Sequence, residues 1–343
     1  MENAVSHAVL QRALDSYRLG NLKAARRPAH GFVNDNWIVE TPQGRFFLKH
    51  RHPSLSRPAV VRAQHALKIW LRRRGFPAPA LLRTAQGQTL LILEGECYEI
   101  QQYIDGTTYE RGRDAHFVEA AGTLGRYHAL VKGFRPPAMS RRGALYCPMI
   151  LAANLARLSE SWHLREDAEL AAIGSELEQQ AGRLAARFAE RERLPAVVIH
   201  GDYYGDNLLF EGDRIVGVVD YDKACWQPRV VELAEALLYF ASSQPGDLKR
   251  LVYRSFLDVP LCAHFVQAYG EHVALSASEA RALPDYVRCI WLQVSLQRLW
   301  EQGPRPADAG EALCEVLTLD RWASDNMEQM AGICEAALER RGG

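Results

Sequence analysis

The sequence lacks the features that mark a secreted or membrane-bound chain. Its seven cysteines are odd in number, scattered along 343 residues and never arranged as CxxC, which excludes a disulfide framework and a CxxC-type zinc site. The first twenty residues have no apolar core of the kind found in signal peptides. No apolar run approaches the length of about 20 residues that crosses a bilayer. We therefore expect a cytoplasmic protein with reduced thiols and no membrane partner.

Net charge is also absent, and one section lacks acidic residues altogether. The 41 basic side chains balance 41 acidic ones, so no global field would draw the chain to nucleic acid. Residues 41–93 contain no Asp or Glu, but they hold ten basic residues: Arg45, Lys49, Arg51, Arg57, Arg62, Lys68, Arg72, Arg73, Arg74 and Arg83. This bias fits a bound polyanion and a solvated basic helix face equally well.

The first hundred residues predict a small, mainly β lobe. Trp37–Glu40 and Arg45–Lys49 have strand character, and the Thr-Pro-Gln-Gly turn between them favours a hairpin. A second pair of strands is expected around Glu94-Gly95. The section between these pairs predicts a helix that ends at Gly75, whose inward face would be formed by Val61, Ala66, Ile69, Trp70 and Leu71.

Helical periodicity dominates the rest of the chain from Asp114 onward, with long amphipathic helices expected over 150–193 and 284–301. Repeats and low-complexity linkers are absent from the sequence. We predict an α+β fold with two domains, residues 1–104 and residues 105–343, which meet near Ile104–Gly106.

The stretch "VVIHGDYYGDNLLFEGDRIVGVVDYDKAC" at 197–225 interrupts the helices and carries six carboxylates within 21 residues. The turn "EGDR" between two apolar runs is a hairpin signal. A hairpin there would pair Leu208–Phe210 with residues near Ile215–Val218. Asn207 and Asp220 would then lie at the same open end, about one strand spacing, ~5 Å, apart. Asp202, five residues ahead of Asn207, would lie close by.

Carboxylates gathered beside buried strands either protonate or meet a cation. A set of amide and carboxylate oxygens suits a hard ion such as Mg²⁺. Asp202 would remain able to accept a proton or to orient a hydroxyl group. The pattern therefore indicates metal-assisted transfer of a phosphoryl group to a hydroxyl.

The motif HGDxxxxN at 200–207, followed by DYD at 220–222, resembles the aminoglycoside phosphotransferase and choline kinase superfamily. The resemblance covers most of the chain. It implies a two-lobed protein-kinase-like fold, with a small mainly antiparallel β lobe and a large mainly α-helical lobe. It also implies ATP and Mg²⁺ as cofactors and a small-molecule acceptor, whether an amino-alcohol, a sugar, homoserine or an aminoglycoside.

The resemblance also gives roles to individual residues of this chain. Asp202 matches the catalytic aspartate, Asn207 and Asp220 match the metal ligands, and Lys49 matches the lysine that meets the α- and β-phosphates. Four further residues match nucleotide-binding positions, two in the loop that covers the nucleotide and two in the hinge that receives adenine: Gly31 and Asn34, Gln102 and Ile104. The superfamily shares this catalytic apparatus with protein kinases.

One departure from the family pattern concerns the partner of Lys49. Kinases of this type pair the lysine with a glutamate of the small-lobe helix, and here Gln64 holds that place. Gln64 could hydrogen-bond Lys49 but could not neutralise it. We hypothesise that Lys49 is positioned by ATP itself or by an acid from outside the helix.

Several neighbouring residues have less specific interpretations. His200 is expected to brace its loop, and Gly201 to allow a close backbone approach or an unusual dihedral angle. Asp222 would bind a second ion or cap the next segment. Aromatic residues of the region would form either core or an acceptor pocket: Tyr203, Tyr204, Trp226, Trp291 and Trp300.

Two alternatives to a small-molecule kinase remain open from the sequence. The first is a bacterial protein serine/threonine kinase, against which stands the short spacing of about ten residues between Asp220 and the next predicted helix. The second is a nucleotide-binding pseudokinase, against which stand the intact motif residues. Acceptor specificity is expected in the helices 150–193 and 284–301, and the oligomeric state is not indicated by the sequence.

Overall fold

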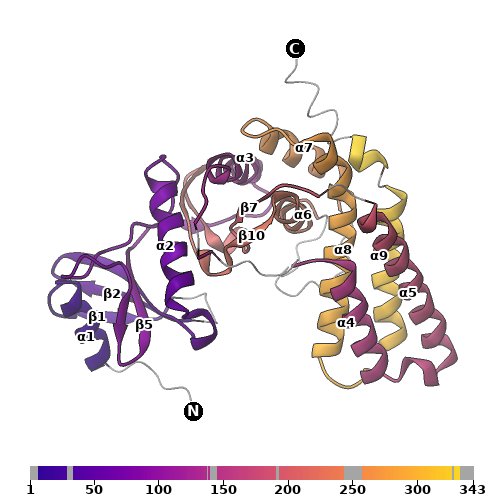
Figure 1. Ribbon diagram of the computed structural model, residues 1–343, viewed down its shortest axis with the longest axis horizontal. Helices are drawn as coiled ribbons and strands as arrows, with labels where there is room; N and C mark the ends of the chain where they lie inside the picture. Colours follow the sequence, from indigo (N-terminus) through magenta and orange to yellow (C-terminus); the bar gives the residue numbers. More distant parts are fainter. Residues whose placement is uncertain are drawn as a thin grey trace. The chain divides into compact units, whose positions relative to one another are not determined.

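The computed structural model describes residues 7–28, 34–136, 138–139, 145–190, 193–242, 257–326 and 328–332. The chain divides into two compact units (Figure 1). The first contains Met1–Glu110, Leu130–Arg141 and Val198–Trp226, and the second contains Arg111–Ala129, Arg142–Val197 and Gln227–Gly343. The carboxylate-rich stretch thus belongs to the same compact unit as the N-terminal hundred residues. The expected domain boundary at residue 104 stays a prediction.

An antiparallel five-stranded sheet organises the first unit, in the order β1-β2-β3-β5-β4. Its strands are β1 Ala24–Arg26, β2 Asp35–Thr41, β3 Gly44–His50, β4 Leu91–Leu93 and β5 Glu96–Gln102. Both predicted strand pairs are confirmed, with Thr41 paired to Gly44 at the first turn and Leu93 to Glu96 at the second. The α+β class is confirmed by this sheet together with the helices of the second unit.

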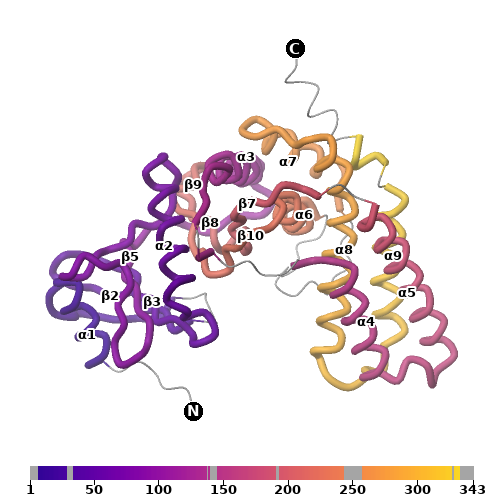
Figure 2. Tube along the Cα trace, viewed as in Figure 1, coloured from indigo at the N-terminus to yellow at the C-terminus, as the bar shows by residue number. Residues whose placement is uncertain are grey.

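The two faces of the sheet have different chemistry because side chains alternate along each strand. Helix α1, His7–Ser16, packs against an apolar face that includes Val39, Leu48, Tyr98 and Ile100. The residues between these positions, Lys49 and Glu99, are directly opposite each other on β3 and β5 and point to the other face. Helix α2, Pro58–Arg72, lies on that second face (Figure 2).

The predicted inward face of α2 is partly wrong. Val61 is buried as expected, but Ala66 is exposed, and Ile69 and Trp70 are only half-buried. Leu71 is also buried as expected, and the helix turns three polar side chains inward together with the apolar Leu67: Gln64, His65 and Lys68. These side chains meet Glu99 and its neighbours, so electrostatic pairing acts together with apolar burial in setting the rotation of the helix. Gly75, at φ 76°, follows the helix as predicted.

The predicted hairpin at 208–218 is confirmed. Strands β8, Leu208–Glu211, and β9, Arg214–Val218, pair antiparallel, with a bulge between Leu209 and Phe210. Strand β6, Thr107–Thr108, completes the sheet on the β8 side. At the open end, the N–H of Val219 donates to the carbonyl of Asn207 at 2.9 Å. This bond brings Asn207 next to the residue that precedes Asp220.

The carboxylate-rich stretch is framed by further short elements. Strands β7, Ala196–Ile199, and β10, Cys225–Pro228, form a two-stranded sheet. Between them lie the single turns η3, Gly205–Asn207, and η4, Tyr221–Lys223. The HGD residues therefore follow a strand directly, and the DYD residues precede one.

The second unit is helical. Its helices are α3 Asp114–Val131 in most of its length, α4 Pro148–Ser161, α5 Ala168–Ala189, α6 Arg229–Phe240, α7 Val259–Gly270, α8 Ala277–Glu301 and α9 Ala309–Asp325. The helices α4, α5, α8 and α9 run side by side (Figure 1, Figure 2). The long α8 begins at a capping box between Ser276 and Glu279. No helix in the described ranges combines the length and hydropathy that a bilayer crossing requires.

Two helical glycines of the second unit have opposite surroundings. A Cβ atom added to Gly125 in α3 would overlap the backbone carbonyl of Tyr269 in α7, whereas one added to Gly182 in α5 would meet no atom within 4 Å. Gly125 is therefore required by the close approach of two helices, and Gly182 is not.

We expect Gly125→Ala to lower the free energy of unfolding by about 1–3 kcal/mol, because backbone must move to admit the methyl group. The matched change Gly182→Ala is expected to raise it by up to about 1 kcal/mol through helix propensity. Urea denaturation of both variants followed by circular dichroism measures the difference. Equal effects of the two substitutions would contradict the close contact at Gly125.

Candidate active site

Lys49 lies on β3 with a buried side chain that meets two of the predicted site's carboxylates. Its Nζ donates to Asp220 Oδ1 at 3.0 Å and to Asp222 Oδ2 at 2.9 Å. Both acids come from outside helix α2, which supports the second form of the hypothesis about this lysine. The side chains of β3 and of the segment 220–222 therefore converge in the absence of a helix glutamate.

The convergence changes the acidity of both partners. Burial opposes the charge of Lys49, but the carboxylates of Asp220 and Asp222 raise its pKa above the ordinary lysine value. Burial by itself would raise the pKa of Asp220, whereas the ammonium group of Lys49 lowers it to about 2. Both groups are therefore charged at neutral pH.

Asp222 is held by donors from three separate segments. Its carboxylate accepts hydrogen bonds from Lys49 and from Asn34 Nδ2, the latter at 2.5 Å, and forms an ion pair with Arg51 Nη2 at 3.0 Å. The oxygen of the Asn34 amide accepts in turn from the N–H of His52 at 3.0 Å. Asp222 thus has an ion-pairing role that neither sequence interpretation included. The role of Asn34 towards a nucleotide stays a prediction.

Glu99 on β5 is fully buried and pairs with the other basic side chains on the α2 side of the sheet. Arg51 donates to its Oε2 through both Nε and Nη2, at 2.9 and 2.8 Å, and Lys68 donates to its Oε1 at 2.7 Å. His65 Nε2 lies 2.7 Å from Oε2. Burial alone would raise the pKa of Glu99, but Arg51, Lys68 and His65 hold it well below the usual glutamate value.

Gln64 links these two groups of charges through hydrogen bonds to partners other than Lys49. Its side-chain oxygen accepts from Arg51 Nη1 at 3.0 Å, and its nitrogen donates to the backbone carbonyl of Asp222 at 2.8 Å. A neutral amide can perform both tasks, because it offers a donor and an acceptor. A glutamate at this position would lose the donor, which gives a physical reason for glutamine here.

Part of the charge of the basic section 41–93 has a cause that neither sequence interpretation included. Three of its ten basic side chains are buried in the ion pairs just described: Lys49, Arg51 and Lys68. The other seven are exposed, as a solvated basic surface requires. The charge bias of the section therefore reflects internal pairing as well as surface.

Asp202 and Asn207 lie together in the HGD loop. Asn207 Nδ2 donates to the backbone carbonyl of Asp202 at 2.9 Å and more weakly to Asp202 Oδ2 at 3.3 Å. Asp202 Oδ1 accepts from Lys223 Nζ at 2.6 Å. Burial raises the pKa of Asp202 above the ordinary aspartate value, and the Lys223 ammonium opposes that rise. Sequence reasoning did not single out Lys223.

The backbone around these residues is unusual in the expected places. Asp220 has φ 64° and ψ 69°, a left-handed conformation that is uncommon for a residue with a side chain. Gly201 has φ 77°, and a Cβ there would lie 2.6 Å from the carbonyl oxygen of Lys223, so both expectations for this glycine are confirmed. His200 is buried, and its Nε2 lies 3.0 Å from the carbonyl of Val219, in agreement with a bracing role.

The predicted nucleotide-binding residues are placed as follows. Gln102 ends β5, and its N–H donates to the carbonyl of Ala80 at 2.8 Å, so an adenine contact would come from another atom. Ile104 is half-buried, and its side chain packs close to Gly217 of β9. Gly31 lies outside the described residues. The nucleotide-binding roles of these residues stay predictions.

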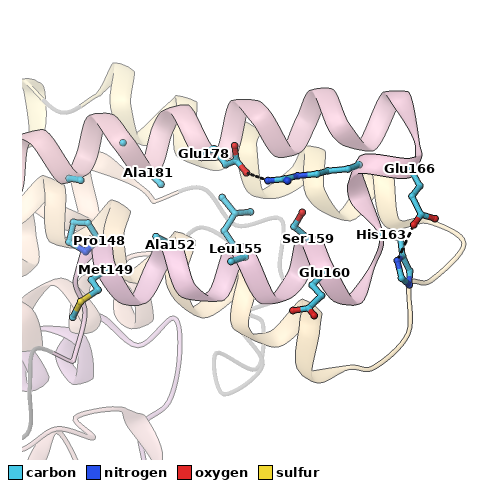
Figure 3. A pocket seen from close by; sticks show the side chains of 14 residues that line it. Pro148, Met149, Ala152, Leu155, Ser159, Glu160, His163, Glu166, Glu178 and Ala181 are labelled. Carbon is cyan, nitrogen blue, oxygen red and sulfur yellow. Dashed lines mark ion pairs between the residues drawn. The ribbon is translucent and has the colours of Figure 1, made fainter.

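A groove lies between α4 and α5 in the second unit, within the region where acceptor specificity was expected (Figure 3). Its volume is about 930 Å³, and its walls are formed by small and apolar side chains such as Ala152, Leu155 and Ala181. Charged residues stand along its length, including Glu178 beside Arg165. No predicted catalytic, metal or nucleotide-binding residue lines the groove.

Of the aromatic candidates for an acceptor pocket, Tyr203 and Trp291 are buried and the other three are half-buried.

The donor set at 202–220 fits a partial shell for a divalent cation. The Asn207 nitrogen donates inside its loop, so its oxygen is the atom that would bind a cation. Asp220 is ionised and one-third exposed. In the described residues, no three His, Cys, Asp or Glu side chains are grouped to hold a metal by themselves. An ion bound by one amide and one carboxylate would take further ligands from water and nucleotide phosphates, as Mg²⁺ does in kinases.

Comparison with known proteins identifies the family. The sequence model of the phosphotransferase enzyme family matches residues 24–271. The chain belongs to this family. It is 31% identical to the homoserine kinase of Pseudomonas aeruginosa over 301 residues, covering 86% of each chain, and 27% identical to that of Methylobacillus flagellatus over 297 residues, covering 86% of this chain and 85% of the relative.

Solved structures confirm the fold. An aminoglycoside phosphotransferase from Alicyclobacillus acidocaldarius matches with a TM-score of 0.71 over 98% of both chains, at 16% identity. A microcompartment-associated aminopropanol kinase matches with a TM-score of 0.64 over 95% of this chain and 99% of that one, at 15% identity. The protein thus has the two-lobed protein-kinase-like fold that the motifs predicted.

The family assignment also confirms the reaction class. The protein is a phosphotransferase that uses a hydroxyl group of a small molecule as its acceptor. The protein-kinase and pseudokinase alternatives are not favoured. A nucleotide and a divalent metal are the cofactors of this class, and the solved amicoumacin kinase contains AMP-PNP and Ca²⁺.

The buried position of Glu99 makes a direct prediction about stability. Glu99→Gln is expected to lower the free energy of unfolding by about 3–5 kcal/mol, because it leaves several cations without a buried counter-charge. Glu40→Gln, which alters an exposed carboxylate of the same sheet, is expected to change it by less than about 1 kcal/mol. Urea titrations of both variants at pH 7 provide the measurement.

The difference in free energy of unfolding between wild type and Glu99→Gln should decrease as the pH falls. The pKa of Glu99 is lower in the folded than in the unfolded chain, where it is about 4.3, so its stabilisation is fully present above that value and is lost as the pH falls. The difference between wild type and Glu99→Gln should therefore narrow below about pH 4. A constant difference from pH 7 to pH 3 would rule out an ionised Glu99.

Proposed function

We propose that this protein transfers the γ-phosphoryl group of ATP, with Mg²⁺ as its metal, to the side-chain hydroxyl of homoserine or a closely similar hydroxy-amino acid. The observation that carries the proposal is the convergence of Lys49, Asp202, Asn207 and Asp220 within one compact unit. Similarity to homoserine kinases over 86% of each chain supports the acceptor class. The cytoplasm, where ATP and free amino acids occur, is the proposed location.

The proposed roles follow from the environment of each side chain. Lys49, charged and buried, would bind the α- and β-phosphates. Asn207 and Asp220 would hold Mg²⁺, which supplies charge neutralisation between the β- and γ-phosphates when bound. Asp202 has a raised pKa and lies in a loop braced by His200. A carboxylate with that property suits a group that orients the acceptor hydroxyl and takes its proton.

In the proposed transfer step, one oxygen–phosphorus bond forms and another breaks, and Asp202 takes the proton that is released. The acceptor oxygen forms a bond to the γ-phosphorus as its proton passes to Asp202. The bond between that phosphorus and the β,γ-bridging oxygen breaks, and its electron pair stays on the departing ADP. Fixed charges around the phosphates stabilise the transition state without reorganisation, which is where this class of enzyme obtains most of its rate.

Removing the proton acceptor should abolish turnover while leaving nucleotide binding intact. Asp202→Asn is expected to lower kcat by at least about 10²-fold, in the range typical of general-base loss, with little change in the Kd for ATP. ADP release is measured with homoserine and with a panel of amino-alcohols, sugars and aminoglycosides. Asp213→Asn, an exposed turn residue of the same hairpin, serves as the control with wild-type kinetics.

The panel of acceptor compounds tests the identity of the acceptor separately from the class of reaction. Homoserine should give the highest kcat/KM of the compounds tested. A better acceptor from another class would replace homoserine in the proposal and leave the phosphotransferase intact. Full activity in Asp202→Asn would remove the proposed role of Asp202.

The metal role of Asp220 makes a separate prediction. Asp220→Asn preserves the side-chain shape and suits the left-handed backbone, since asparagine tolerates that conformation, but it removes the charge. We expect activity to require a Mg²⁺ concentration at least about tenfold higher, with a lower maximum rate. Titration of Mg²⁺ at saturating ATP tests this. Identical Mg²⁺ dependence in variant and wild type would show that Asp220 is not a ligand.

A further inference from the structure

Lys223 places a cation directly on the predicted catalytic aspartate. Its Nζ lies 2.6 Å from Asp202 Oδ1, although the two residues are 21 positions apart in the chain. Asp202 is largely enclosed, with 16% of its side chain exposed, whereas 52% of the Lys223 side chain is exposed. An ammonium group has three N–H donors. The contact with Asp202 uses one of these donors.

The backbone is built to permit this approach. The carbonyl of Lys223 faces Gly201, the residue just before Asp202, so closely that a Cβ there would lie 2.6 Å from the oxygen. Gly201 also has the positive φ that favours glycine. The two loops can therefore meet only because residue 201 has no side chain, and this meeting brings residue 223 to residue 202.

The other cations of the site are committed to different partners. Lys49 is bound to Asp220 and Asp222, and Arg51 is bound to Glu99 and Asp222. Within residues 198–226, which the structure describes throughout, the sequence offers one further lysine or arginine besides Lys223. This is Arg214, which pairs in register with Glu211 at the turn end of the hairpin, away from the open end that carries Asp220.

We propose that Lys223 is a catalytic residue of the phosphoryl transfer: it holds Asp202 through Oδ1 and contacts an oxygen of the transferred phosphoryl group. The inference rests on the proposed function, because it assumes a phosphoryl group delivered beside Asp202. In the transfer, the acceptor proton moves to Asp202, the new oxygen–phosphorus bond forms, and the bond to the departing ADP breaks. The ammonium group of Lys223 keeps its protons and balances the charge on the phosphoryl oxygens.

The magnitude of the effect distinguishes this role from a surface ion pair. A half-exposed pair contributes about 0–1 kcal/mol to stability, so its removal should hardly affect folding. A preorganised donor on a transition-state oxygen is worth about 10²–10³ in kcat. Lys223→Met should therefore lower kcat by about 10²-fold, with the KM values of ATP and acceptor changed less than about threefold and the thermal midpoint nearly unchanged.

The experiment compares four variants of the full chain by ADP release with ATP, Mg²⁺ and homoserine. Lys223→Arg keeps a cation and should retain at least about a tenth of the wild-type kcat. Lys223→Ala should regain activity in proportion to added methylammonium, which can occupy the place of the lost ammonium group. Arg214→Met removes an exposed cation of the same hairpin and should behave as wild type. Rescue by methylammonium is a response that a purely structural lysine would not give.

Each result bears on one proposal or the other. A kcat of Lys223→Met within twofold of wild type, or a loss seen only in KM, overturns the role of Lys223. If wild type releases no ADP in response to homoserine, the acceptor proposal fails, and the same variants are compared by Mg²⁺-dependent hydrolysis of ATP to water. There the same loss is expected, and equal hydrolysis rates overturn the inference. If wild type shows neither reaction, both proposals fall.

Discussion

The buried carboxylate of Glu99 is the constraint on which the first unit depends. A charge removed from water is tolerated only where opposite charges and hydrogen bonds replace its hydration. Here Arg51, Lys68 and His65 supply them from β3's end and from α2. Because those partners must reach one point, the strand, the helix and the chain after β3 are fixed together. The polar side chains of α2 therefore attach the helix to the sheet, together with the apolar contact of Val61.

This attachment extends to the segment 220–222 through Arg51. The same guanidinium group that contacts Glu99 contacts Asp222, and Gln64 supports both ends of the connection. A planar guanidinium with several donors can bridge two carboxylates in fixed geometry, which a lysine ammonium does less well. The position of Lys49 is thus set by a chain of buried charges from β5 to residue 222. Networks of this kind favour a single arrangement when every member is satisfied.

Local signals allowed much of this to be predicted. The hairpins at 41–44 and 211–214 were readable because turn residues and strand alternation lie within a few positions of each other. The pairing of Asn207 with the segment before Asp220 followed from that geometry. The face of α2 was misjudged because the inward side was assumed to be apolar. The sequence did contain a signal for a polar inward face. Any buried cation of the section 41–93, which has ten basic residues and no acid, needs a carboxylate from another section, and Glu99 lies in the middle of the next strand, β5. Lys223 could not be found locally, since its contact depends on two loops meeting at Gly201.

The two carboxylates of the DYD motif, Asp220 and Asp222, have different environments and therefore suit different roles. Asp222 is 6% exposed and has partners on both oxygens, an ion pair with Arg51 on one and hydrogen bonds from Lys49 and Asn34 on the other. Asp220 is 33% exposed, has a left-handed backbone and meets Lys49 through one oxygen. A carboxylate whose oxygens are already bonded gains little from a metal ion, whereas a partly exposed and ionised one gains much. Of the two aspartates, Asp220 therefore has the environment that suits the proposed metal ligand, and Asp222 has the one that suits the placement of Lys49. The strained backbone at residue 220 is understandable as the means of turning the two side chains to these different partners.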